Sequence, residues 1–356
     1  MHEKVSELFS KIKPKNVLIR HLHSEVYFAY FTGLPLDGFD SNLLILNKGK
    51  KSAIVTSNLD HGTVSKLKEF SVHNVKTKKE FDTFLKHQIQ GKEIGLDLDA
   101  FTVNEFAKIK QWFKGKKIMD ISQELRNLRS IKTKNELKFI GKACSITEKA
   151  LAKVPECYAK GMTEKELALK IECEMKSKGA DSALANPSIV RSQGNAGIPH
   201  HVTSDKKIGT GWLLLDIGCK YKNYCADLTR TFFVGKPTVH DHELYELVVK
   251  AKQSAEENLK AGAVAKNLYF QAETVLAEKK HTMLHALGHG VGLEVHDVPD
   301  RMGPDSNWKL AENMVVTIEP GIYWNQGGIR LEDTYAVTKK GFAKFCKPAP
   351  KELIEV

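Results

Sequence analysis

The first third of the chain alternates short apolar runs with amphipathic stretches. Strands are predicted at four apolar runs, NVLIR (16–20), NLLILN (42–47), SAIVTS (52–57) and EIGLDL (93–98). The intervening NKGKK is typical of a hairpin turn, and residues 102–113 show helical spacing. This alternation predicts an α/β domain that ends near Leu128.

A different pattern follows. Sequences of the form T-x-x-E at 133–136 and 163–166 are capping boxes, which predict that a helix begins at each. Strand patterns then dominate, apart from a helical stretch at about 241–260. A chain of 356 residues is also long for one core, so we expect two domains, 1–130 and 131–356.

Acidic residues interrupt an apolar strand pair at residues 211–235. Asp216 and Asp227 fall in the middle of the two predicted strands. Asp is depleted in strands and costs on the order of several kcal/mol when it is buried as an unpaired ion. Across a two-residue hairpin loop, opposed residues have an odd sum of residue numbers. Because 216 and 227 satisfy this rule, both carboxylates should face the same side.

A second strand pair, residues 313–337 around a turn at 325–328, repeats this arrangement. Glu319 ends one apolar strand and Glu332 interrupts the next, again with an odd sum. The loop is longer, which leaves the register open. Solvated, surface-facing carboxylates are the simpler explanation for any one of these residues. Four together would raise one another's pKa or require a cation between them.

Histidines are crowded into HALGHGVGLEVHD, residues 285–297. A carboxylate-rich site with one imidazole suits Mn²⁺, Co²⁺ or Zn²⁺. Four carboxylates carry more charge than one divalent ion neutralises, so we expect two ions. Two such ions share a bridging hydroxide, which is a nucleophile at neutral pH.

Composition narrows the class of protein only modestly. Residues 1–135 carry 24 Lys and Arg against 15 Asp and Glu, but these lysines are scattered without interleaved aromatic residues, so nucleic acid is not an expected partner. The six cysteines form no CxxC pair, which favours reduced thiols and a cytoplasmic location. The N-terminus lacks an apolar signal segment, and no apolar run reaches 18 residues, so no membrane association is expected.

Taken in order, Asp, Asp, His, Glu and Glu make the chain similar to the pita-bread-fold metallopeptidases, within the proline-specific branch of prolidase and aminopeptidase P. The matching segments span the chain: YFTG (30–33), LRSIKTKNEL (128–137), PSIVRSQGNAGIPHH (187–201), LLLDIGCKY (213–221), ADLTRTF (226–232), HALGHGVGLEVHD (285–297), TIEPGIY (317–323) and GIRLEDT (328–334). The resemblance implies an α+β protein with a C-terminal pita-bread (creatinase/aminopeptidase-like) domain and a smaller α/β creatinase-like N-terminal domain.

The resemblance also implies a role for each acidic position. Asp216 would bind one metal ion, and Asp227 and Glu332 would bridge both ions. His289 and Glu319 would complete the second site. Glu319 would in addition act as the general base and pass the proton to the leaving amine. The implied reaction is hydrolysis of an Xaa-Pro peptide bond with two ions, Mn²⁺ or Co²⁺, and Zn²⁺ as a further candidate.

Two more histidines match family positions. His200 and His296 would face the substrate and bind the scissile carbonyl or the tetrahedral intermediate. His285 would stand one helical turn from His289 if the segment is helical; it is a candidate for a supporting or proton-relay role, with simple packing as the alternative. The resemblance further implies a homodimer that acts on small peptides with proline at the second position.

Dipeptidase and aminopeptidase P differ in what lies beyond the proline. A dipeptidase must bind the substrate's terminal carboxylate, for which Arg330 and Arg301 are candidates. Prolidases tend to place an arginine directly after the HExP segment, where this chain has Asp300. This departure leaves aminopeptidase P as the alternative to the favoured dipeptidase.

Other members of the fold family fit less well. Methionine aminopeptidase shares the ligands but usually lacks a domain like residues 1–130, whereas creatinase lacks the five ligands. Metal-free pita-bread binding modules have lost ligands that are all present here. Their only support is the basic N-terminal domain, so that reading is the remote alternative.

Overall fold

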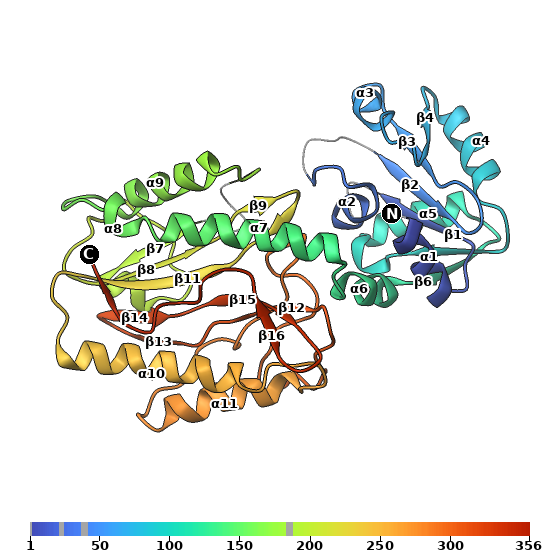
Figure 1. The fold of residues 1–356 in the computed structure, drawn as a ribbon. Helices are drawn as coiled ribbons and strands as arrows, with labels where there is room; N and C mark the ends of the chain where they lie inside the picture. Colours follow the sequence, from blue (N-terminus) through green and yellow to red (C-terminus); the bar gives the residue numbers. More distant parts are fainter. Residues whose placement is uncertain (1, 21–24, 37–41, 183–187) are drawn as a thin grey trace. The chain divides into compact units, whose positions relative to one another are not determined.

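A computed structural model describes residues 2–20, 25–36, 42–182 and 188–356 of the chain (Figure 1). The chain divides into two compact units, Met1–Arg129 and Ser130–Val356. None of the described helices is both long enough and apolar enough to span a bilayer.

The first unit is built on a six-stranded sheet with strand order β4-β3-β2-β1-β5-β6. Its strands are β1 (Asn16–Arg20), β2 (Leu43–Asn47), β3 (Ala53–Thr56), β4 (Ser71–Asn74), β5 (Glu93–Leu96) and β6 (Lys117–Asp120). Its helices are α1 (His2–Lys11), α2 (Glu25–Thr32), α3 (His61–Val64), α4 (Lys78–Gln88), the short 3₁₀ helix η1 (Leu98–Ala100), α5 (Val103–Trp112) and α6 (Ser122–Ser130), the last of which crosses the boundary between the units.

The four strands predicted in this unit are confirmed as β1, β2, β3 and β5, and β2 and β3 form the predicted hairpin. The sequence patterns missed β4 and β6. Both lie at the edges of the sheet, and their residues are only partly buried or exposed. An edge strand has no continuous apolar face, so the hydrophobic pattern does not reveal it.

The second unit contains a four-stranded sheet, a three-stranded sheet and two two-stranded ribbons. Its strands are β7 (Ile189–Ser192), β8 (Gly211–Ile217), β9 (Lys220–Tyr221), β10 (Tyr224–Cys225), β11 (Leu228–Val234), β12 (Val315–Ile318), β13 (Gly321–Trp324), β14 (Gly327–Arg330), β15 (Asp333–Val337), β16 (Phe342–Lys344) and β17 (Ile354–Glu355). Its helices are α7 (Lys134–Leu151), α8 (Val154–Cys157), α9 (Glu164–Ser177), the 3₁₀ helix η2 (Gln193–Gly197), α10 (Val239–Glu256) and α11 (Ala265–Ala277).

Two pairs of helices cover the strands of this unit. The pair α7 and α9 lies on one side, and the pair α10 and α11 lies on the other (Figure 1). Both predicted capping boxes are formed, at the starts of α7 and α9. The helix α11 was not predicted, because Val264 precedes it and provides no side-chain cap. The apolar faces of α10 and α11 form one buried core with strands β8 and β11–β15.

Candidate metal centre

The first acidic pair lies on a hairpin that keeps one register along its length. Asp216 pairs with Thr229 between β8 and β11, and Tyr221 pairs with Tyr224 between β9 and β10. The turn between β9 and β10 has two residues, both with positive φ, as the twist of a tight hairpin requires. Asp227 stands two residues before Thr229, so it shares a face with Asp216 as the parity rule predicts.

The second acidic pair is directly opposed. Ile318 pairs with Asp333 between β12 and β15, and Gly321 pairs with Arg330 between β13 and β14. Glu319 and Glu332 therefore face one another in the gap between these two ladders. The expected longer loop was wrong, because only residues 325–326 separate β13 from β14. The two-residue turn fixes the register that the sequence left open.

His289 is held beside the second pair by backbone hydrogen bonds to β12. Its carbonyl accepts a hydrogen bond from the Thr317 N–H (2.8 Å), and its N–H donates to Thr317 Oγ1 (3.0 Å). Residues 285–297 contain no helix, so the spacing of His285 and His289 does not reflect a helical turn. A Cβ on Gly288 would lie 2.2 Å from the Thr317 carbonyl oxygen, so glycine permits this close approach.

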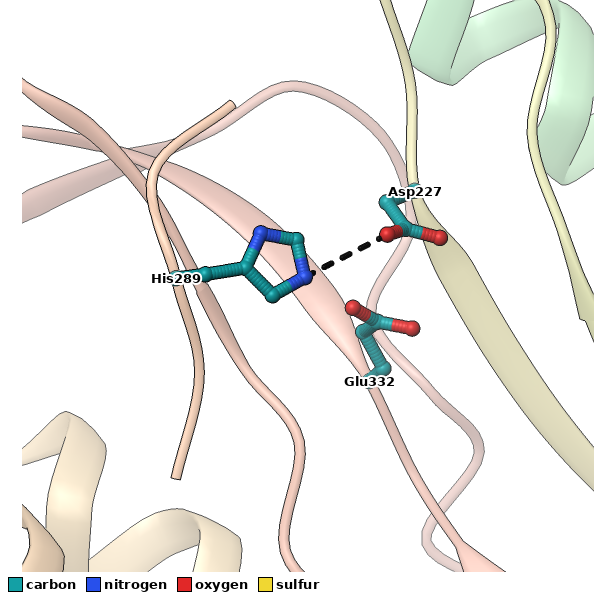
Figure 2. Close-up of side chains that lie close together, drawn as sticks. All are labelled: Asp227, His289 and Glu332. Atoms are coloured by element: carbon teal, nitrogen blue, oxygen red, sulfur yellow. Dashed lines mark ion pairs between the residues drawn. The ribbon is translucent and has the colours of Figure 1, made fainter. Parts of the chain in front are cut away.

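Asp227, His289 and Glu332 converge on one point (Figure 2). Each offers a ligand atom, and the three atoms lie within 4.8 Å of one another. His289 Nε2 is 3.4 Å from Asp227 Oδ2 and 3.4 Å from Glu319 Oε1. Its Nδ1 donates a hydrogen bond to the Gly290 carbonyl oxygen (3.0 Å), which leaves Nε2 directed at the carboxylates.

Burial and mutual repulsion disfavour the ionised carboxylates of this cluster unless a cation lies between them. Burial raises the pKa of Glu332 well above its usual range, and the charges of Asp227 and Glu319 raise it further. Burial also raises the pKa values of Asp227 and Glu319. Burial lowers the pKa of His289, but its hydrogen bond to Asp227 and the charge of Glu319 outweigh this and raise it to about 9.

One buried atom is left without a protein partner at this cluster. Glu332 Oε2 accepts a hydrogen bond from Thr229 Oγ1 (2.7 Å), whereas Oε1 has no hydrogen-bond partner among the described residues. A buried carboxylate oxygen is costly to leave unsatisfied. Carboxylates with one imidazole are a donor set that divalent transition ions accept, so the residues fit a metal ion.

Asp216 is connected to a chain of polar side chains. Its carboxylate contacts the Arg330 guanidinium, which also donates from Nη1 to Tyr323 Oη (3.0 Å) and from Nε to Thr229 Oγ1 (3.2 Å). Tyr323 Oη is also 2.8 Å from His285 Nε2. Burial and the nearby Arg330 lower the pKa of His285 to about 4, so this histidine is neutral near pH 7.

A pocket of about 970 Å³ opens over the cluster. The ten predicted site residues all line it: His200, Asp216, Asp227, His285, His289, His296, Arg301, Glu319, Arg330 and Glu332. The rings of His289 and His296 stand edge to face, 4.3 Å apart. Arg301 lies at an exposed part of the lining, paired with Asp305 at 2.8 Å.

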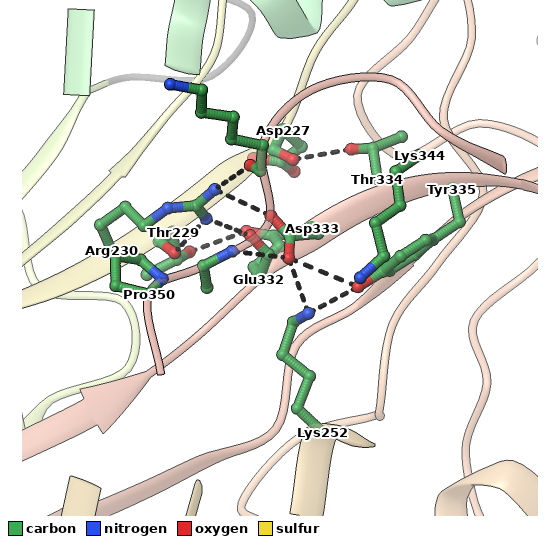
Figure 3. Close-up of polar contacts among 12 residues, drawn as sticks. Asp227, Thr229, Arg230, Lys252, Glu332, Asp333, Thr334, Tyr335, Lys344 and Pro350 are labelled. Carbon is green, nitrogen blue, oxygen red and sulfur yellow. Dashed lines mark hydrogen bonds and ion pairs between the residues drawn. The ribbon is translucent and has the colours of Figure 1, made fainter. Parts of the chain in front are cut away.

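A second network of hydrogen bonds and ion pairs lies around Asp333, on the face of β15 that points away from the pocket (Figure 3). Asp333 follows Glu332 and points away from the pocket, where its carboxylate pairs with Arg230 (2.8 Å) and Lys252 (2.6 Å). Arg230 Nη1 also donates to the backbone carbonyl of Glu332 (2.7 Å), and the Ala349 N–H donates to Asp333 (3.0 Å). These contacts fix the backbone of Glu332 from the side that faces away from the pocket.

Sequence reasoning missed Tyr323 and Asp333. Tyr323 lies in a motif that had been recognised, TIEPGIY, but nothing in the pattern indicated that it links Arg330 to His285. Asp333 could have been noticed, because two adjacent acidic residues in a strand must face opposite sides and both need a partner when buried.

Two sequence comparisons define the class of protein. The family description "Metallopeptidase family M24" matches residues 138–339, and "Creatinase/Prolidase N-terminal domain" matches residues 12–131. The chain belongs to metallopeptidase family M24, and it is a metal-dependent peptidase of α+β fold with a creatinase-type N-terminal domain. The predicted family and fold class are confirmed.

Individual relatives match over the whole length. An Xaa-Pro dipeptidase from Pyrococcus horikoshii is 36% identical, and the match covers 99% of each chain. The crystal structure of an X-Pro aminopeptidase from Thermotoga maritima has a TM-score of 0.90 at 29% identity, covering 98% of this chain and 99% of that one. The prolidase structure from Pyrococcus horikoshii has a TM-score of 0.88 at 33% identity, covering 99% and 100%.

Proposed function

We propose that this chain is an Xaa-Pro dipeptidase that hydrolyses the bond before proline. The observation that carries the proposal is the convergence of two acidic pairs and His289 on one pocket. Full-length similarity to a protein named Xaa-Pro dipeptidase supports the choice of substrate. An X–Pro bond lacks an N–H and has a fixed φ, so it needs a site built for it.

In this proposal the metal ligands are Asp216, Asp227, His289, Glu319 and Glu332. They hold two divalent ions, Mn²⁺ or Co²⁺, with Zn²⁺ as a further candidate. When bound, such ions supply Lewis acidity and lower the pKa of water. Two observations support the assignment: Glu332 Oε1 has no hydrogen-bond partner among the described residues, and His289 Nε2 points at the carboxylates of Asp227 and Glu319.

The remaining roles belong to side chains around the pocket. Glu319 accepts a proton from water and delivers it to the leaving amine. His200 and His296 bind the carbonyl oxygen of the scissile bond. Arg330 donates to three protein groups, so we assign it to holding Asp216 in place. His285 contacts Tyr323, which accepts from Arg330, so His285 supports this arrangement. Arg301, with an exposed side chain at the pocket lining, is the better candidate to bind the substrate's carboxylate.

An Xaa-Pro aminopeptidase acting on longer peptides is the second candidate. Asp300 stands where prolidases tend to have an arginine, and the pocket volume leaves room beyond a dipeptide. We also propose a cytoplasmic homodimer. The free cysteines support the location, and the family resemblance supports the dimer; light scattering on the purified protein tests the dimer.

One set of assays tests the proposal. The metal content of the purified protein is measured, and Mn²⁺- and Co²⁺-loaded protein is assayed on Xaa-Pro dipeptides and Xaa-Pro-Xaa tripeptides. We expect about two ions per chain and dipeptide cleavage that Asp227→Ala abolishes. Cleavage of tripeptides alone would select the aminopeptidase. Cleavage of neither substrate by metal-loaded protein would refute the proline specificity.

A further inference from the structure

The segment that carries His200 is fixed at both ends by a single carboxylate. This segment, residues 192–204, leaves β7, forms η2 and lines the pocket from Pro199 to Thr203. Glu164 Oε1 accepts hydrogen bonds from the start of the segment: from Ser192 N (2.8 Å), Ser192 Oγ (3.0 Å) and Asn195 Nδ2 (3.0 Å).

The other oxygen of Glu164 binds the end of the segment. Oε2 accepts hydrogen bonds from Ser204 N (3.1 Å), Ser204 Oγ (2.7 Å) and His201 Nε2 (3.2 Å). Six donors thus converge on one fully buried side chain. Burial by itself raises the pKa of Glu164, but the hydrogen bonds from Ser204, Asn195 and Ser192 outweigh it and lower the pKa. The carboxylate is therefore ionised at neutral pH.

Glu164 is not required for the local structure of its own helix. The capping box at the start of α9 is completed by Thr163 and Glu166, whose carboxylate is exposed. A buried carboxylate is unfavourable unless its hydrogen bonds compensate for lost hydration. The donors that compensate for this cost all come from residues 192–204, so Glu164 stabilises the tertiary structure around that segment rather than its own helix.

A buried arginine holds the middle of the segment. Arg191 is fully buried, and its Nη1 donates to the backbone carbonyl of Ile198, two residues before His200. The Ile198 carbonyl also accepts from the His201 N–H at 3.1 Å. His200 itself is exposed, so its place over the pocket depends on the backbone on either side of it.

We propose that Glu164 is a positioning residue that holds residues 192–204 so that His200 faces the substrate. The inference rests on the proposed function, because it assumes that His200 contacts the scissile carbonyl. Glu164 does not line the pocket and so acts through the segment. A displacement of about 1 Å in a group that binds the reacting carbonyl can cost about 10²-fold in rate.

The test replaces the carboxylate while keeping its size. In Glu164→Gln the new amide directs N–H groups at one set of three donors, so one end of the segment must detach. We expect kcat/KM on Xaa-Pro dipeptides to fall by about 10–100-fold, mainly through kcat, at unchanged metal content. The matched control is Glu166→Gln, which removes the same charge from the same helical turn. This variant should keep kcat and KM near the wild-type values.

Amide hydrogen exchange supplies a readout that does not depend on catalysis. In Glu164→Gln the amides of Ser192 and Ser204 should exchange faster, while those of β8 and β11 stay protected. Unchanged exchange at both serines would show that Glu164 does not hold residues 192–204 in place, and this test is valid even if the wild-type protein cleaves no Xaa-Pro peptide. Fast exchange with wild-type kcat and KM would overturn the positioning role.

A milder variant covers the case in which Glu164→Gln does not fold. Ser204→Ala removes the shortest of the six hydrogen bonds and leaves the carboxylate in place. We expect a smaller change of the same kind in kcat and in exchange at residue 204. A Ser204→Ala protein with wild-type values for both would contradict the proposal.

Discussion

Thr229 offers a sharp test of how the protein supports its metal ligands. Its hydroxyl donates to Glu332 Oε2 at 2.7 Å and accepts from Arg330 Nε at 3.2 Å, in a fully buried position on β11. Thr229→Val keeps the volume of the side chain and removes both hydrogen bonds. It deprives Glu332 of the one hydrogen bond that its carboxylate makes among the described residues.

The size of the effect follows from the charge on the acceptor. A hydrogen bond to a charged group contributes about 1.5–3 kcal/mol. Loss of a residue that orients a metal ligand typically lowers metal affinity by about 10–100-fold, which corresponds to about 1.4–2.8 kcal/mol. The two estimates overlap, so we expect Thr229→Val to weaken metal binding by at least about tenfold.

Thr231→Val is the matched control. Thr231 lies two residues further along β11, is equally buried, and exchanges hydrogen bonds with the backbone of Arg330 (2.9 and 3.2 Å) rather than with a carboxylate. Titration calorimetry of metal-stripped protein with Mn²⁺ measures affinity, and denaturant unfolding without metal measures stability. Both variants should be destabilised, but only Thr229→Val should bind Mn²⁺ more weakly. Equal Mn²⁺ affinities of the two variants would refute the reasoning.

Two further substitutions test the frame around the site. Asp333→Ala removes the carboxylate that pairs with buried Arg230 and one of the two carboxylates that pair with buried Lys252, and it should lower the free energy of unfolding by about 3–5 kcal/mol. Asp305→Ala, which breaks an exposed pair, should cost about 0–1 kcal/mol by the same denaturant titration; equal losses would contradict the network's role. Gly288→Ala places a Cβ 2.2 Å from a β12 carbonyl oxygen, whereas Gly341→Ala meets no atom within 4 Å. Only Gly288→Ala should lower the melting temperature, measured by calorimetry, and the amount of bound metal, measured by metal analysis.

The acidic pairs could be predicted because the argument needed only parity. A shift of one residue in register turns a side chain to the other face, so the period of two by itself places Asp216 on the same face as Asp227, and Glu319 on the same face as Glu332. The length of the second turn was wrong, yet parity was unaffected, because the actual register also pairs residues with an odd sum.

Other features could not be derived this way because they depend on tertiary neighbours. Glu164 and Glu166 both look like exposed glutamates in the first turn of a helix. The capping role of Glu166 is local and was predictable, whereas the six donors around Glu164 come from residues at least 28 positions away. Arg330 was one of two candidates to bind the substrate's carboxylate; its contact with Asp216, which joins two ribbons more than 100 residues apart in sequence, could not be derived from the strand pattern.

The two ribbons share a feature that explains why the ligands lie where they do. Each keeps one register through two ladders separated by a short gap, and Asp227, Glu319 and Glu332 all stand in these gaps. Backbone groups released there bond across the ribbons instead: the Glu332 N–H donates to the Thr229 carbonyl (3.2 Å), and Thr334 Oγ1 donates to the Asp227 carbonyl (2.7 Å). The gaps between the ladders therefore leave backbone groups available for hydrogen bonds between the ribbons, and they also bring the carboxylates together. Because these hydrogen bonds join protein groups on the two ribbons, the fold itself sets the positions of the carboxylates.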